Sequence, residues 1–107
     1  MNLRDTLNGS VQSQGIKVDV RAWLDMGSKE WQDTEPDIKA RAYQAALVTG
    51  WTDQGLISFM TKEFAPRVDE EWAKLTLDTL RDCLKEVSIL KFLRRKWRII
   101  ARFAVKR

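Results

Sequence analysis

The chain of 107 residues contains no histidine and a single cysteine, Cys83. Without histidine, the Ser-His and Cys-His pairs of nucleophilic enzymes are excluded, as are the mixed Cys/His sets that hold structural zinc. A lone cysteine cannot form an internal disulfide, which favours a reducing compartment. We therefore predict a cytoplasmic protein that is not an enzyme and that uses no metal or other cofactor.

Glycine and long apolar runs are also scarce. The five glycines are scattered, so no glycine-rich loop is present that could cradle a phosphate group. No stretch approaches the roughly 20 apolar residues that a membrane-spanning helix needs. The acids Asp78 and Asp82 have helical spacing, but no histidine accompanies them, and nearby bases indicate an exposed charged face instead.

What the chain does contain is helical periodicity, because apolar residues recur every three or four positions from about residue 19 onward. We predict an all-α fold: a small single-domain bundle of four or five helices with a long or kinked C-terminal helix. Residues 1–16 are polar and are expected to form a flexible arm, whereas residues 17–107 form the helical domain. Caps and breakers set the predicted boundaries at Ser28, Pro36, Gly50, Thr52 and Pro66.

One spacing resembles the corner between two helices of a DNA-binding helix-turn-helix. A small residue, Ala46, precedes Gly50 by four positions, and Leu56 follows six positions later. The helix after the turn carries two acids and one base, whereas a helix that reads a DNA groove normally meets phosphates with more positive charge. We interpret this segment as a plain helical corner.

The most unusual feature of the sequence is its charge distribution. Residues 1–90 hold eleven Lys/Arg against fifteen Asp/Glu, a formal charge of −4. Residues 91–107 hold eight Lys/Arg and no acid, a formal charge of +8, interleaved with three aromatic residues. A mildly acidic body therefore carries a strongly basic end.

On a helical wheel of about 100° per residue, residues 89–107 form a basic amphipathic helix. Its basic arc occupies the direction that the apolar residues Ala73, Leu77 and Leu80 occupy in the preceding segment. The phase changes near Ser88, which is able to cap a new helix. Two alternatives follow: a kink or break at Ser88, or one continuous helix whose halves face different neighbours.

Eight bases without an acid exceed what solubility requires, so we predict that the basic helix binds a partner. The first hypothesis is nucleic acid, contacted mainly through its phosphates with little sequence readout. The alternative is an adaptor or inhibitor that docks on an acidic protein surface or on a second copy of itself as a homodimer. A membrane surface ranks third. Trp97 is assigned as a stacking platform or anchor, and the predicted contact residues are Lys91, Arg94, Arg95, Arg98, Arg102 and Lys106.

Overall fold

Six helices make up the part of the chain that the computed structural model describes, namely the backbone of residues 2–105 and the side chains of residues 2–88. This part contains no strand, which confirms the all-α prediction. The count exceeds the predicted four or five because the N-terminal segment is also a helix. In chain order the helices are α1 (Leu3–Ser13), α2 (Val20–Leu24), α3 (Lys29–Asp33), α4 (Pro36–Val48), α5 (Asp53–Glu63) and α6 (Glu70–Val105).

Side-chain caps begin most of the short helices. Asn2, Asp19, Ser28 and Thr52 each accept a hydrogen bond from a backbone N–H in the first turn of the helix that follows. These bonds satisfy donors that have no partner inside the helix. The predicted starts at Ser28, Pro36 and Thr52 are confirmed, although the cap residue of α4 makes no side-chain bond.

The N-terminal segment corrects one expectation. Residues 1–16 were expected to be a flexible arm, but Leu3–Ser13 form α1 instead. Leu7 and Val11, one turn apart on this helix, are fully buried in the common core. Only two apolar residues face inward on an otherwise polar helix, so the sequence pattern is weak although the burial is complete.

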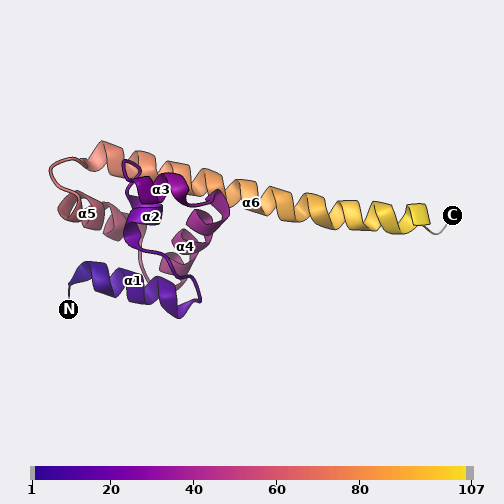
Figure 1. Cartoon of the computed structure of the whole chain (residues 1–107), viewed down its shortest axis with the longest axis horizontal. Coiled ribbons are helices and arrows are strands. Elements are labelled where there is room, and N and C mark those ends of the chain that lie inside the picture. The colour runs from indigo at the N-terminus through magenta and orange to yellow at the C-terminus, as the bar shows by residue number, and fades with distance from the viewer. Residues whose placement is uncertain (1, 106–107) are drawn as a thin grey trace.

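In Figure 1, helices α2 to α5 lie between α6 on one side and α1 on the other. The core between them is built on the fully buried side chains of Trp23, Phe59 and Leu56, with Leu77 and Leu80 supplied by α6. Phe59 meets two further aromatic rings edge-on, those of Trp51 and Phe64. One core therefore joins the described helices, and the one-turn α3 contributes Trp31, which packs against it.

Helix α6 is much longer than the bundle it packs against. Its second half continues past the other five helices, so that the Cα atoms span 62 Å along the longest axis and only 26 and 23 Å across it (Figure 1). Of the two alternatives at Ser88, the structure has the continuous helix: the backbone is helical from Glu70 to Val105 without a break. One continuous helix therefore connects the bundle to the basic end.

Candidate contact surface on the C-terminal helix

The bundle covers one face of α6, and four buried residues mark it. Ala73, Thr76 and Leu80 are fully buried and Leu77 nearly so. Trp72 and Leu75 on the other side are exposed. Leu84 extends the buried face and packs partly against the core. This arrangement agrees with the apolar centre that the periodicity predicts for the first half of the helix.

The predicted contact residues stand in the register of this bundle-facing side. Eighteen residues make about five turns of an α-helix, so positions eighteen apart lie in line along it. Lys91, Arg95 and Arg98 follow Ala73, Leu77 and Leu80 at this interval. The same interval relates Arg94 to Thr76 and Arg102 to Leu84. The register that is apolar beside the bundle thus becomes basic where α6 leaves it.

Most of the predicted site residues are placed by backbone only. Lys91, Arg94, Arg95, Trp97, Arg98 and Arg102 lie on α6, but their side chains are outside the described residues, and Lys106 lies outside altogether. Trp97 takes the register of Thr79, eighteen positions earlier, rather than that of the buried stripe. The backbone therefore separates Trp97 from the basic stripe by part of a turn.

A hollow of about 530 Å³ lies on α6 where the bundle ends. The described residues that line it are Arg81, Leu84, Lys85 and Ser88. Ser88 is exposed, and Lys91 and Arg95 follow it three and seven positions later, on the same side of a helix. The hollow therefore leads from the bundle to the basic register of the second half.

Arg81 is held in place by the neighbouring helix α5. Its guanidinium donates hydrogen bonds to the carboxylates of Asp53 and of Asp78, and the hydroxyl of Tyr43 donates to the other oxygen of Asp53 at 2.7 Å. Burial raises the pKa of Asp53, but the hydrogen bonds from Tyr43 and Arg81 outweigh it and leave that pKa below its usual value. Two acids accompany Arg81, and Glu86 follows Lys85, so the net positive charge of α6 begins at Lys91.

A second cluster joins α3, α4 and α6, and no pattern in the sequence had indicated it. The Nζ atom of Lys39 lies 4.0 Å from the centroid of the Trp31 ring, a cation–π contact, and the side chain is largely buried. Burial lowers the pKa of Lys39, and burial also raises the pKa of the nearby Cys83 thiol. A thiol with a raised pKa is a poor nucleophile, so this cluster has the properties of a structural contact.

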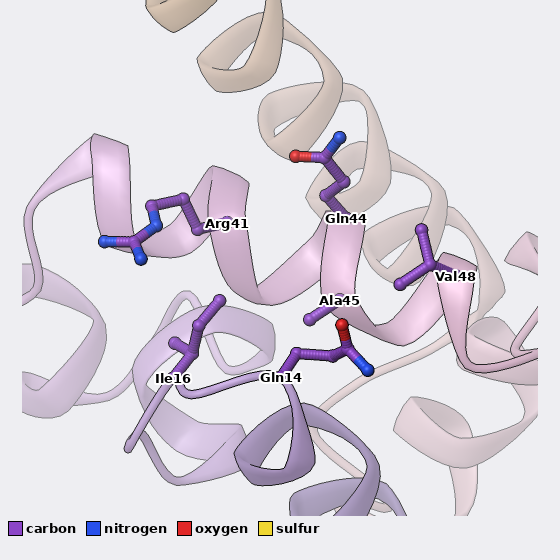
Figure 2. Close-up of a pocket in the computed structure, with 6 residues that line it drawn as sticks. All are labelled: Gln14, Ile16, Arg41, Gln44, Ala45 and Val48. Atoms are coloured by element: carbon purple, nitrogen blue, oxygen red, sulfur yellow. The ribbon is translucent and has the colours of Figure 1, made fainter.

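The pocket in Figure 2 lies between the C-terminal end of α1 and helix α4 and has a volume of about 270 Å³. Ile16 and Ala45 supply apolar lining, and Gln14, Gln44 and Arg41 supply the polar groups. The polar side chains extend in different directions in Figure 2. A small-molecule site needs polar groups that converge on one point, so this pocket does not form one.

The corner between α4 and α5 has the local geometry of the predicted motif. Ala46 and Leu56 are fully buried, and Gly50 adopts a φ of +103° in the turn between them. Asp53, the first residue of α5, is engaged with Tyr43 and Arg81. The corner therefore packs into the core, an arrangement that a plain helical corner and a helix-turn-helix share.

Within the described part of the chain, no group of three or more potential metal ligands comes together. None of the described helices is long and apolar enough to cross a membrane. Comparison with known proteins adds no relative: no family model matches the chain, and neither the curated proteins nor the solved structures gave a match. The geometry of α6 is therefore the observation from which a function can be inferred.

Proposed function

We propose that this protein is a non-enzymatic, cytoplasmic binding protein whose basic C-terminal helix contacts nucleic acid through the phosphate backbone. One observation carries the proposal: α6 continues unbroken beyond the bundle, and there its bundle-facing register changes from apolar to basic. A register that merely became exposed to solvent would become polar with charges of both signs, whereas this one carries Lys and Arg and no acid. A row of Lys and Arg residues along one side of a helix instead matches a linear array of anions.

The dimensions of the helix support this mode of binding. Lys91 and Arg102 are separated by about 17 Å along the axis, at about 1.5 Å per residue, which is long enough to meet several successive phosphates. An α-helix is also narrow enough to enter the major groove of duplex DNA. Trp97 stands off the basic register, so base stacking is not required for the contact.

The acidic body restricts binding to this one surface. Residues 1–90 carry a formal charge of −4 against +8 for residues 91–107, so the field of the molecule directs an anionic partner to the end of α6. Such contacts follow the backbone and carry little sequence information. The proposed activity is therefore general binding rather than recognition of one site.

Oligonucleotide binding at two salt concentrations tests the proposal. If the helix meets about 4–6 phosphates, affinity for labelled single- or double-stranded oligonucleotides falls by orders of magnitude on raising the salt concentration. Changing Arg94, Arg95, Arg98 and Arg102 to Gln should remove most of the binding. The matched control changes four exposed bases of the body to Gln, namely Lys17, Arg21, Lys29 and Lys62, and should retain it.

Two outcomes overturn the proposal. Absence of binding by the intact protein at low salt excludes nucleic acid as the partner. Equal losses in the two Gln variants would show that total charge, and not the C-terminal helix, governs binding. In either case the alternative function, docking of this helix on an acidic protein surface, takes its place.

A further inference from the structure

Two large apolar side chains are exposed on the outer face of α6, opposite the bundle. Trp72 is 38% exposed and Leu75 is 50% exposed, whereas Ala73 between them is fully buried. Exposed apolar residues that line up on one face of a helix often mark an interface. This face differs from the basic register, so what it binds is a separate question from the proposed contact with nucleic acid.

The outer face continues along the whole helix with the spacing of a coiled coil. From Trp72, alternating steps of three and four residues reach Leu75, Thr79, Asp82 and Glu86. A second step of four then leads to Leu90, and the alternation resumes from there. The positions on this outer stripe are 72, 75, 79, 82, 86, 90, 93, 97, 100 and 104, and those from 90 onward are Leu90, Leu93, Trp97, Ile100 and Ala104. A seam with this 3–4 spacing is what two helices need in order to pack along their length.

We propose that the outer stripe of α6 binds α6 of a second copy of this chain, in antiparallel orientation about a two-fold axis near Ser88. Ser88 lies close to the middle of the 36-residue helix, so the basic half of each copy lies along the acidic half of the other. The dimer is independent of the proposed nucleic-acid contact, which uses the other side of the helix.

Charge decides the orientation. In the first half of α6, Asp78, Asp82 and Glu86 are exposed on or beside the outer stripe. A parallel pair would bring like charges together, with Lys96 beside the partner's Lys96 and Asp82 beside the partner's Asp82. The antiparallel pair instead brings Lys96 of each copy to the acids of its partner, as charge complementarity requires. Lys96 then lies near the partner's Asp78 and the partner's Asp82.

Side-chain size agrees with the same alignment. With Ser88 at the centre, residues whose numbers add to 176 lie opposite each other. Trp72 then faces the partner's Ala104, and Thr79 faces the partner's Trp97. Large residues meet smaller ones at both positions, which is how facing helices interdigitate. Because the interface is symmetric, each of these contacts is made twice.

The fold leaves this face open to a second copy. The bundle covers the side of α6 that carries Ala73, Leu77 and Leu80. Beyond the bundle, no other helix of the described chain lies beside α6 (Figure 1). A partner helix can therefore follow the outer stripe from end to end without meeting the bundle.

Sedimentation equilibrium on the full chain tests the dimer. The intact protein should have the mass of two chains, and Leu75→Glu should weaken the dimer by roughly tenfold or more, since the change occurs twice in the interface. Val48→Glu, at an apolar residue of α4 that is 65% exposed, is the matched control and should keep the dimer. The Gln variant at Arg94, Arg95, Arg98 and Arg102 should also remain dimeric. A monomer at every concentration, or equal weakening by both Glu changes, overturns the proposal.

Oxidative cross-linking tests the orientation and keeps the proposal falsifiable if Leu75→Glu fails to fold. In the antiparallel pair, Thr79 faces position 97 of the partner and lies about 27 Å along the axis from the partner's Thr79. A variant that carries Thr79→Cys and Trp97→Cys, with Cys83→Ser, should form a disulfide between position 79 of one chain and position 97 of the other, identified by mass spectrometry. Efficient cross-linking of position 79 to position 79 would overturn the antiparallel arrangement.

Discussion

The guanidinium of Arg67 donates two parallel hydrogen bonds to the carboxylate of Asp25, Nη1 to Oδ1 and Nη2 to Oδ2, each 2.7 Å long. The Asp25 side chain is 5% exposed, so Arg67 compensates a charge that is almost out of water. The pair joins the end of α2 to the segment before α6, across 42 residues of sequence. Charged fork-to-fork contacts of this kind are among the stronger hydrogen bonds in proteins.

Gly27 is the neighbour on which this contact depends. A Cβ atom at Gly27 would lie 2.7 Å from Nη1 of Arg67, too close for the guanidinium to stay in place. Because the displaced group is the end of a flexible side chain that is 53% exposed, we predict that Gly27→Ala lowers the free energy of unfolding by no more than about 1 kcal/mol. Urea denaturation measures the change. In an Arg67→Ala background the penalty should vanish, and a penalty of the same size there would contradict this explanation.

Acid should destabilise the protein partly through Asp53. Although burial raises the pKa of Asp53, its hydrogen bonds with Tyr43 and Arg81 bring that pKa below the usual value. A carboxyl with a lowered pKa in the folded state stabilises the fold above its unfolded pKa of about 3.9, and that contribution is lost as the pH falls through the folded value. The melting temperature should therefore fall less steeply from neutral to acid pH for Asp53→Asn than for the unaltered protein. Equal slopes would contradict the assignment.

Two glycines should respond oppositely to alanine. Gly50 has a φ of +103°, a conformation that strains any residue with a side chain, so Gly50→Ala should destabilise the fold by about 1–2 kcal/mol. Gly9 lies inside α1, and no atom comes within 4 Å of the point where a Cβ atom would lie, so Gly9→Ala should stabilise by about 0.5–1 kcal/mol. Denaturation of the two variants side by side measures the change in the free energy of unfolding. A change of the same sign in both variants would be inconsistent with these conformations.

The role of α1 in the core can be measured directly. Leu7 is fully buried, and we predict that Leu7→Ala lowers the free energy of unfolding by about 2–5 kcal/mol. Leu3 on the same helix is 53% exposed, so Leu3→Ala should change it by less than about 1 kcal/mol. If the two variants were equally stable, α1 would be an appended arm and not part of the core.

Local signals in the sequence predicted much of the fold. Ser28 and Thr52 indicate helix starts because a short side-chain oxygen caps the first turn, and Gly50 indicates a turn because it tolerates positive φ. These effects act within a few residues and are readable from sequence. The existence of α1 could not be predicted in this way. Leu7 and Val11 become core residues only because the fold brings other helices against them.

Contacts between distant parts of the chain could not be predicted. Nothing near Asp25 indicates that Arg67 will pair with it, and nothing near Lys39 distinguishes it from an ordinary surface base until Trp31 is placed beside it. The candidate site was more accessible to sequence reasoning. The change of phase near Ser88 comes from periodicity alone, and the burial of Leu77 and Leu80 confirms which side of the first half faces the bundle. The periodicity did not decide whether the helix breaks at Ser88, and the backbone of α6 shows that it is continuous there.

The unbroken course of α6 past Ser88 makes the helix a lever. Its first half is fixed by the core, and its second half extends about 25 Å further at about 1.5 Å per residue. Val105 lies about 38 Å along the helix from Leu80, so a rotation of about 10° where Leu80 meets the bundle would move the far end by about 6–7 Å. A load applied at that end would in turn act on Leu77 and Leu80 as a torque, so repacking of the core and displacement of the distant end are mechanically the same event.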